Sequence, residues 1–100
     1  MIKKKDGKGH SRSFSTSDII FKEGQLGDCA YLIESGQVEI FVSTKNDKTI
    51  ISRLGPGEIF GEMAILDNSR RETSARANSE VKLSIVTKEA LSERIDEADP

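Results

Sequence analysis

Residues 30–42 have the sequence AYLIESGQVEIFV, in which two apolar runs flank a glycine. The runs at 30–33 and 38–42 contain the β-branched and aromatic residues that are typical of strands. Residues 34–37 between them have the composition of a tight turn. We therefore predict an antiparallel hairpin at this point of the chain.

The second run also indicates which side chains point inward. Val38, Ile40 and Val42 alternate with other residues, so they are expected to share one face of a strand. By the same alternation, Glu39 is expected to face solvent.

The pattern continues on both sides of this hairpin. Residues 19–21 and 49–54 are further short β-rich runs, and residues 81–85 alternate between apolar and polar side chains. The runs are separated by glycine-bearing turns, at Gly24, Gly27, Gly36, Gly55 and Gly57. This punctuation predicts a mainly β fold, an antiparallel β-roll similar to a jelly roll.

Composition limits the classes of protein that need to be considered. The chain has 100 residues and 35% hydrophobic content, which suffices for one modest core. Its 15 basic and 17 acidic side chains give a net charge of -2, so nucleic acid is not an expected partner. No apolar run has membrane length, so no membrane partner is expected. The single cysteine, Cys29, is expected to be a small buried hydrophobe in a reducing, cytoplasmic setting.

The two ends of the chain differ from the β-rich middle. Residues 1–13 are rich in lysine and glycine, which predicts a flexible basic leader before a folded domain at 14–100. Near the end, Thr87 can cap a helix. Apolar residues then recur at helical spacing, at Leu91, Ile95 and Ala98. We therefore predict a short amphipathic C-terminal helix.

Residues 55–77 interrupt the β pattern. Residues 62–66 are good helix formers and follow Gly61, which predicts a one-turn helix inserted between strands. The free N–H groups at the start of such a helix can bind an anion. Arg70 and Arg71 follow closely, and an arginine fork beside a helix start suits a phosphodiester with one negative charge.

This segment resembles the phosphate-binding cassette of the cyclic-nucleotide-binding domain family, which includes bacterial catabolite activators, kinase regulatory subunits and cyclic-nucleotide-regulated channels. Residues 60–65 match the first half of the family pattern, Phe-Gly-Glu-x-Ala-Leu. The second half is matched at three positions, Arg71, Ser74 and Ala77. Upstream motifs at 20–38 and 55–58 match in the same order, so the resemblance covers about residues 14–98. It implies a regulatory β-roll that binds a cyclic nucleotide.

The resemblance also implies roles for individual residues. Glu62 would accept a hydrogen bond from the ribose 2′-hydroxyl, and Arg71 would pair with the phosphate oxygens. Gly61 and Ala64 would allow close backbone approach and donate N–H groups to ribose and phosphate. Ser74 lies where the family often has Thr or Ser near the base. The residues predicted to bind the ligand are Gly61, Glu62, Ala64, Arg71, Glu72, Thr73 and Ser74.

Neighbouring side chains have simpler interpretations. Met63 and Ile65 are expected to pack beneath the cassette, while Arg70 and Arg76 are expected to be solvated. Glu72 departs from the family pattern, because relatives usually carry Ala, Ser or Thr directly after the phosphate arginine. Its carboxylate would repel the phosphate unless it turned away. The absence of the Thr that relatives use for cyclic GMP favours cyclic AMP, although a carboxylate could instead accept from guanine N–H donors.

The predicted function is a non-enzymatic sensor that binds cyclic AMP, with cyclic GMP as the second candidate ligand, and signals to a protein effector without a cofactor. Relatives continue into a long helix that caps the purine, whereas this chain ends at Pro100, so this lid is expected to be missing. An alternative is a family member that has lost binding and acts as an interaction scaffold, as Glu72 would favour. A metal-dependent jelly-roll enzyme is a third hypothesis, but His10 is the only histidine available.

Overall fold

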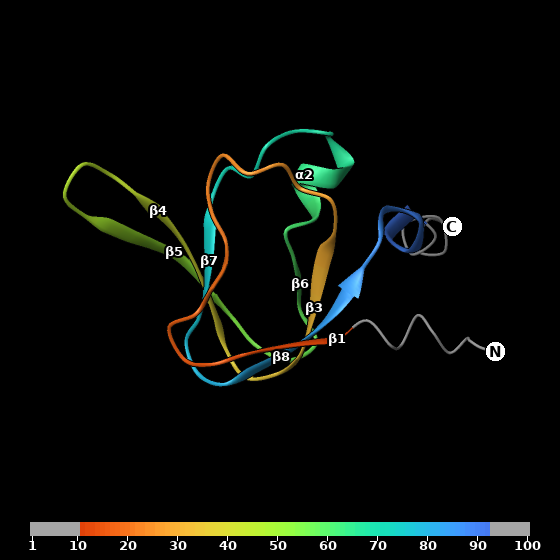
Figure 1. Cartoon of the computed structure of the whole chain (residues 1–100), viewed down its shortest axis with the longest axis horizontal. Coiled ribbons are helices and arrows are strands. Elements are labelled where there is room, and N and C mark those ends of the chain that lie inside the picture. Colours follow the sequence, from red (N-terminus) through yellow and green to blue (C-terminus); the bar gives the residue numbers. More distant parts are fainter. Residues whose placement is uncertain (1–10, 93–100) are drawn as a thin grey trace.

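The computed structural model describes residues 11–92, where the chain folds into two four-stranded antiparallel sheets (Figure 1). The strands are β1 (Ser11–Phe14), β2 (Ile19–Phe21), β3 (Ala30–Ser35), β4 (Val38–Ser43), β5 (Lys48–Leu54), β6 (Ile59–Phe60), β7 (Ser74–Ala77) and β8 (Val81–Val86). One short helix, α2 (Glu62–Leu66), lies between β6 and β7. The predicted antiparallel β-roll with an inserted cassette helix is confirmed.

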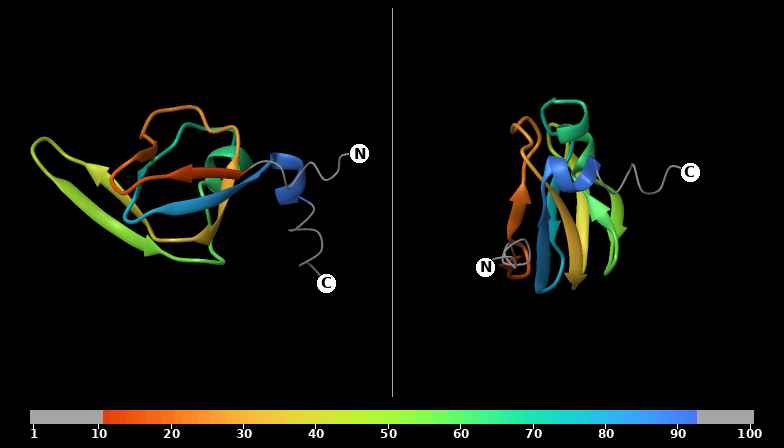
Figure 2. Two further views of the ribbon diagram at one scale, coloured as in Figure 1. Left: turned by 60° about the horizontal axis from the view of Figure 1, so that its bottom comes forward. Right: turned by 90° about the vertical axis from the view of Figure 1, so that its right-hand side faces the viewer.

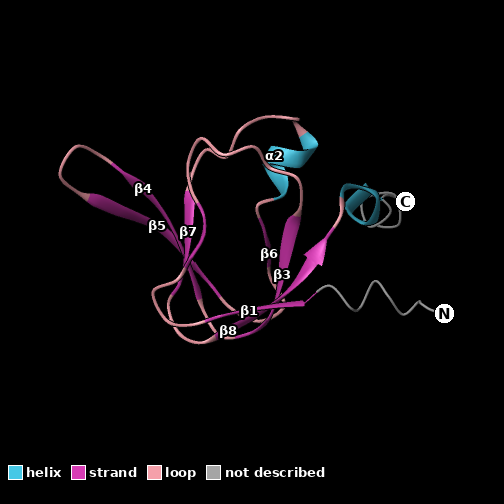
Figure 3. Ribbon diagram, viewed as in Figure 1, coloured by secondary structure: helices cyan, strands magenta, loops and turns pink. Residues whose placement is uncertain are grey.

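The two sheets pack face to face around one apolar core. One sheet has the strand order β1-β8-β3-β6 and the other has the order β2-β7-β4-β5. Figures 2 and 3 show the strands around the body of the domain and the β4–β5 hairpin extending beyond it. Both sheets contribute the main buried side chains, which are Phe21, Tyr31, Ile33, Val38, Phe60, Ala75, Ala77, Val81 and Leu83.

The five predicted runs agree closely with strands of the structure. β6 and β7, however, lie within residues 55–77, where the β pattern was expected to be interrupted, and the start of the chain also differs. β2 begins and ends as predicted, and β3, β4, β5 and β8 extend the predicted runs by one or two residues. β1, however, begins at Ser11, although residues 11–13 were assigned to the leader. Pairing decides this difference, because Ser11 lies opposite Ser84 and Phe14 lies opposite Val81 on β8. The prediction for residues 1–10 lies outside the described residues.

Glu39 corrects one prediction from the alternating pattern. Val38 and Ile40 do pack toward the core, so Glu39 lies on the outer face of β4 as expected. It is nevertheless only 5% exposed. Its neighbours across β7 and β5 are Arg76 and Arg53, and both pair with its carboxylate. Glu39 is therefore covered by its partners on the sheet surface and does not face solvent.

The end of the described chain turns helical over residues 88–92. Thr87 caps this segment, since its hydroxyl oxygen accepts a hydrogen bond from the Ala90 N–H at 3.1 Å. Leu91 is buried against Ile65 of α2 and Val86 of β8. The cap and the first apolar position of the predicted helix are thus confirmed, while Ile95 and Ala98 lie outside the described residues.

Candidate functional site

The predicted ligand residues gather around a hollow of about 160 Å³ between α2 and the segment that leads into β7. In Figure 1 this region lies at the end of the roll that carries α2. Six of the seven predicted residues line the hollow: Gly61, Glu62, Ala64, Arg71, Glu72 and Thr73. The structure therefore brings together side chains from both halves of the cassette.

Arg71 is the buried cation of this hollow. It is 6% exposed, and its Nη1 and Nη2 groups donate to the carbonyl oxygens of Gly61 and Cys29 at 2.6 and 2.8 Å. Its Nε is buried without a hydrogen-bond partner, and no carboxylate of the described residues forms an ion pair with it. A guanidinium offers five N–H donors, so most of its donor capacity remains for an anion.

An aromatic cluster supports the guanidinium from below. Phe21 of β2, Tyr31 of β3 and Phe60 of β6 pack with ring centroids 5.3 to 6.1 Å apart. The Arg71 guanidinium carbon lies 4.2 Å from the Phe21 ring centroid, within the range of a cation–π contact. Because these rings come from both sheets, the position of Arg71 depends on the folded core.

Two glycines leave the space that Arg71 occupies. A β-carbon on Gly27 would lie 2.5 Å from the Ala64 β-carbon and 3.1 Å from the Arg71 guanidinium carbon. A β-carbon on Gly61 would lie 2.8 Å from Nη1 of Arg71, and Gly61 also has a φ of +81°, where other residues are strained. A side chain at either position would displace the arginine or the cassette helix.

The cassette helix presents its first turn to the hollow. Gly61 caps α2 without a side-chain hydrogen bond, and half-buried Glu62 is the first helical residue. Ala64 and Ile65 are buried, as expected for residues beneath the cassette. Met63 was expected to pack there too, but it is 58% exposed and lines the rim of the hollow. A five-residue helix on a surface cannot bury every apolar side chain, and Met63 falls on its outer face.

Ser74, Arg70 and Arg76, for which the sequence also gave predictions, lie in three different environments. Ser74 is buried outside the hollow, and its hydroxyl accepts a hydrogen bond from the Glu23 N–H at 3.0 Å. Arg70 is exposed but donates to the carbonyl oxygen of Gly24 at 2.8 Å and lines the hollow. Arg76 is half-buried and pairs with Glu39, so the solvated interpretation was wrong for this residue.

The loop at residues 24–26 holds the second half of the cassette, and the sequence did not predict this contact. The Arg71 N–H donates to the Gln25 carbonyl oxygen at 2.8 Å, and the Gly24 N–H donates to the Arg71 carbonyl oxygen at 2.9 Å. Leu26 and Arg70 form an isolated β-bridge beside these bonds. The partners are more than 40 residues apart in the chain, so no local spacing could have revealed the contact.

Cys29 was expected to be a buried side chain of the core. It is half-buried and packs against the main core cluster. Burial raises the pKa of its thiol above the ordinary value. Burial, followed by the hydrogen bond with Cys29, raises the pKa of Tyr31 to about 12. Both groups therefore stay protonated and neutral at physiological pH, and neither adds charge beside Arg71.

Within residues 11–92, no three His, Cys, Asp or Glu side chains gather in a group that could hold a metal ion. No helix found there is long and apolar enough to cross a membrane.

Comparison with known proteins agrees with the geometry of the hollow. Residues 11–98 match the family described as the cyclic nucleotide-binding domain. The chain belongs to this family. The predicted resemblance is therefore confirmed, and the match includes both halves of the cassette and the strands of the roll.

Three relatives illustrate the match. A cAMP-dependent protein kinase regulatory subunit from Emericella nidulans is 40% identical over 70% of this chain, and the aligned part is 16% of that protein. The Cyclic AMP receptor protein of Thermus thermophilus is 39% identical over 72% of this chain and 34% of its own length. The cAMP-bound structure of EAL enzyme Bd1971 superimposes with a TM-score of 0.82 at 47% identity, over 90% of this chain and 24% of that one. This chain thus spans about a third of the length of one relative and a quarter or less of the other two.

Proposed function

We propose that this domain is a regulatory sensor that binds a cyclic purine nucleotide at the α2 hollow, with cyclic AMP favoured over cyclic GMP. The observation that carries the proposal is Arg71, a buried cation that has carbonyl partners but no carboxylate among the described residues. An anion with several acceptor oxygens would satisfy its remaining N–H groups and its charge. A cyclic phosphate has one negative charge and suits this single guanidinium.

The neighbouring groups suit the sugar that accompanies a cyclic phosphate. Glu62 lines the same hollow as Arg71, and its carboxylate can accept a hydrogen bond from a ribose hydroxyl. Gly61 and Ala64 line the hollow at the start of α2, where their backbone N–H groups would donate to ribose and phosphate. Arg71 would therefore hold the phosphate while Glu62 fixes the orientation of the ribose.

Two observations support cyclic AMP as the preferred ligand. Glu72 borders the hollow in place of the Thr associated with cyclic GMP recognition in the resembling family. The two curated relatives compared above are both named for cyclic AMP. The EAL enzyme Bd1971 has been solved with cyclic AMP and also with cyclic GMP, so both nucleotides belong in the test.

The sensor is proposed to act on a protein effector in the cytoplasm and to perform no chemistry on its ligand. Among the described residues that line the hollow, no hydrogen bond joins the hydroxyls of Ser69 and Thr73 to a carboxylate that could act as a general base. The relatives named as a kinase regulatory subunit and a receptor protein point to the same regulatory role.

Isothermal titration calorimetry with cyclic AMP, cyclic GMP and linear 5′-AMP tests the proposal. We expect one saturable site for cyclic AMP, weaker binding of cyclic GMP, and at least about tenfold weaker binding of 5′-AMP. Chromatography of the recovered nucleotide should show no hydrolysis. Absence of binding by both cyclic nucleotides would support the scaffold alternative, and turnover by pure protein would contradict the sensor assignment.

A further inference from the structure

A second candidate binding surface lies on the outer face of the sheet formed by β2, β7, β4 and β5, away from the α2 hollow. Val38 and Ile40 of β4 pack in the core, so Glu39 and Phe41 project from the opposite face. Phe41 is nevertheless only 7% exposed, which is unusual for an aromatic ring on the outside of a two-sheet roll. Charged side chains provide its cover.

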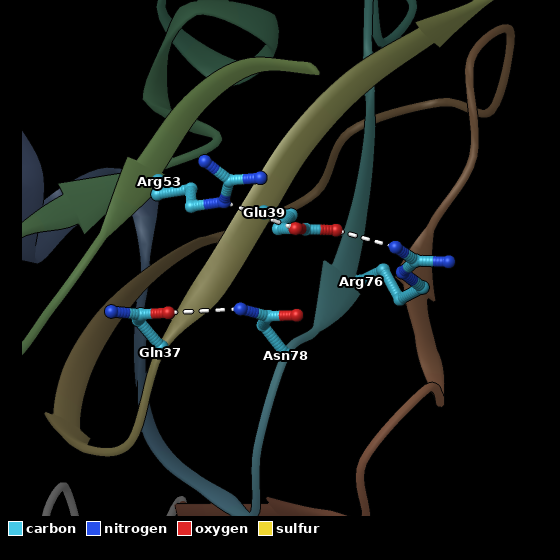
Figure 4. Close-up of polar contacts among 5 residues, drawn as sticks. All are labelled: Gln37, Glu39, Arg53, Arg76 and Asn78. Atoms are coloured by element: carbon cyan, nitrogen blue, oxygen red, sulfur yellow. Dashed lines mark hydrogen bonds and ion pairs between the residues drawn. The ribbon is translucent and has the colours of Figure 1, made fainter. Parts of the chain in front are cut away.

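A row of charges crosses this face from β5 to β7 (Figure 4). Arg53 Nε donates to one carboxylate oxygen of Glu39 at 3.2 Å, and Arg76 Nη2 donates to the other at 2.5 Å. These bonds use one N–H group of each arginine and engage both carboxylate oxygens. The side chain of Arg53 remains 59% exposed. The row therefore has a net positive charge, and its arginines have further donors to offer.

A hollow of about 480 Å³ with mixed polar and apolar lining lies beside this row. It is lined by Ile19, Lys22, Glu23, Phe41, Ser43 and Ser74. Ile19 is 41% exposed, and Phe41 lies beneath cations, with Lys48 Nζ at 5.0 Å and the Arg76 guanidinium carbon at 5.7 Å from its ring centroid. The hollow therefore combines one exposed apolar side chain, Ile19, with cations near the ring of Phe41.

The acidic side chain in the hollow, Glu23, is exposed and accepts one hydrogen bond. Glu23 Oε1 accepts a hydrogen bond from the Ser43 N–H at 3.0 Å, whereas Lys22 is exposed on the border. The row and the hollow together contain three cations, Lys22, Arg53 and Arg76, and two carboxylates, and Lys48 lies above Phe41 as a fourth cation. The whole chain has the opposite balance, with 17 acidic and 15 basic side chains. This face is therefore a local concentration of positive charge on an acidic domain.

We propose that this outer face docks an acidic protein segment that inserts an apolar side chain between Ile19 and Phe41. Carboxylates on either side of that anchor would meet Lys22 and the free donors of Arg53. A protein segment fits better than a single-stranded nucleic acid, because the hollow offers the exposed side chain of Ile19 to a hydrophobic anchor. Phe41 is 7% exposed and lies beneath two cations, so it offers little ring surface on which a base could stack.

The docking face can be tested apart from nucleotide binding. Lys22 is exposed, and it does not line the α2 hollow. Arg71 in turn does not line the docking hollow. A Lys22→Glu variant should therefore bind cyclic nucleotide as the unmodified chain does, which also shows that the variant is folded.

The probe is a short synthetic peptide with one leucine between two pairs of glutamates, titrated into the nitrogen-15-labelled protein. We expect saturable amide shifts centred on Ile19, Lys22 and Ser43. Lys22→Glu should weaken the interaction about fivefold or more. Lys88→Glu makes the same change of charge in the helical segment 88–92, at the opposite end of the molecule from the β4–β5 hairpin, and should leave it unchanged (Figure 1).

Two further probes decide between kinds of partner. A peptide with serine in place of the leucine should bind clearly more weakly, and a short oligothymidylate should not shift the same amides. Equal binding by the serine peptide would remove the apolar anchor from the proposal. Binding of the oligothymidylate at the same residues, equal losses in the Lys22 and Lys88 variants, or no shifts with the leucine peptide would each overturn it.

Discussion

Arg71 and Glu39 are two buried charges in the described chain, and the fold treats them in opposite ways. Both side chains are about 5–6% exposed. Glu39 lies between two arginines on the outer face of a sheet, and both of its oxygens are paired. Arg71 lies above an aromatic cluster with only carbonyl partners, and its Nε is unpaired.

This contrast indicates that Glu39 has a structural role, whereas Arg71 is the residue proposed to bind the ligand. A buried charge is expensive unless a partner compensates it, and Glu39 has that compensation within the chain. No carboxylate of the described residues pairs with Arg71, so a bound anion would neutralise its charge. Removing Arg71 should therefore affect binding, whereas removing Glu39 should affect stability.

The largest expected effect tests the binding side of the comparison. Arg71→Ala removes the cation that would neutralise the phosphate, and losing one partner of a buried charge pair costs about 2–5 kcal/mol. Affinity for cyclic AMP should fall between about thirtyfold and a few thousandfold, measured by calorimetry. Arg71→Lys, which keeps the charge and loses the fork, should show a smaller loss.

The neighbouring arginine supplies the control for this prediction. Arg70→Ala removes an exposed side chain that donates to the Gly24 carbonyl oxygen, and it should weaken binding far less than Arg71→Ala. If Arg70→Ala were the more damaging change, the assignment of the phosphate residue would be wrong. Thermal unfolding of Arg70→Ala should stay close to that of the unmodified chain. Arg71→Ala also removes hydrogen bonds to the carbonyl oxygens of Gly61 and Cys29, so its unfolding temperature is measured together with its affinity.

The next effect in size concerns Glu62. Glu62→Ala removes an acceptor for the ribose hydroxyl, and a hydrogen bond to a charged group contributes about 1.5–3 kcal/mol. We expect cyclic AMP affinity to fall roughly tenfold to a hundredfold in the same calorimetric titration. Glu62→Gln keeps an acceptor oxygen and should lose less. Equal losses in both variants would argue against a hydroxyl contact.

The stability side of the comparison depends on Glu39. Glu39→Gln leaves Arg53 and Arg76 without a carboxylate, but both arginines reach water, so the loss should be moderate. We expect the free energy of unfolding in urea to fall by about 1–2 kcal/mol. Glu34→Gln is the control, because Glu34 is exposed and its pair with Lys82 is long, at 3.9 Å. Equal losses in the two variants would contradict a special role for Glu39.

The same pair predicts a pH dependence. The hydrogen bond from Arg76, and then that from Arg53, hold the carboxyl pKa of Glu39 below its ordinary value despite burial. Since the folded-state pKa is lower than the unfolded one, this contribution is complete above about pH 4.3 and is lost as pH falls through the folded value. Unfolding in urea at several acidic pH values should show the gap between the unmodified chain and Glu39→Gln closing.

Glu72 should give the smallest effect. It borders the hollow and is exposed, so solvent screens its repulsion of the ligand. Glu72→Ala should strengthen cyclic AMP binding by about fivefold or less at low salt, with a gain that shrinks as salt rises. Glu72→Thr should improve cyclic GMP more than cyclic AMP. If Glu72→Ala instead abolished binding, the carboxylate would recognise the base and the cyclic AMP preference would be lost.

Prediction from sequence succeeded where the pattern is local. The cassette helix, α2 (Glu62–Leu66), and the strand β2 (Ile19–Phe21) were placed with correct bounds, because helix formers after a glycine and short β-rich runs act over a few residues. Met63 was misplaced since helical spacing does not tell which side of a short surface helix faces the body.

The sequence by itself determined that this chain forms an antiparallel roll with the cassette motif of its family. The signals for this are alternating apolar side chains, glycine-bearing turns and the cassette motif, and each is a pattern of residues close together in the chain. Only the tertiary structure decided which charges are covered and by what. Glu39 meets its arginines across two other strands, and Arg71 is held by the carbonyl oxygens of Gly61 and Cys29. Such compensation depends on residues distant in the chain, and no local pattern encodes it.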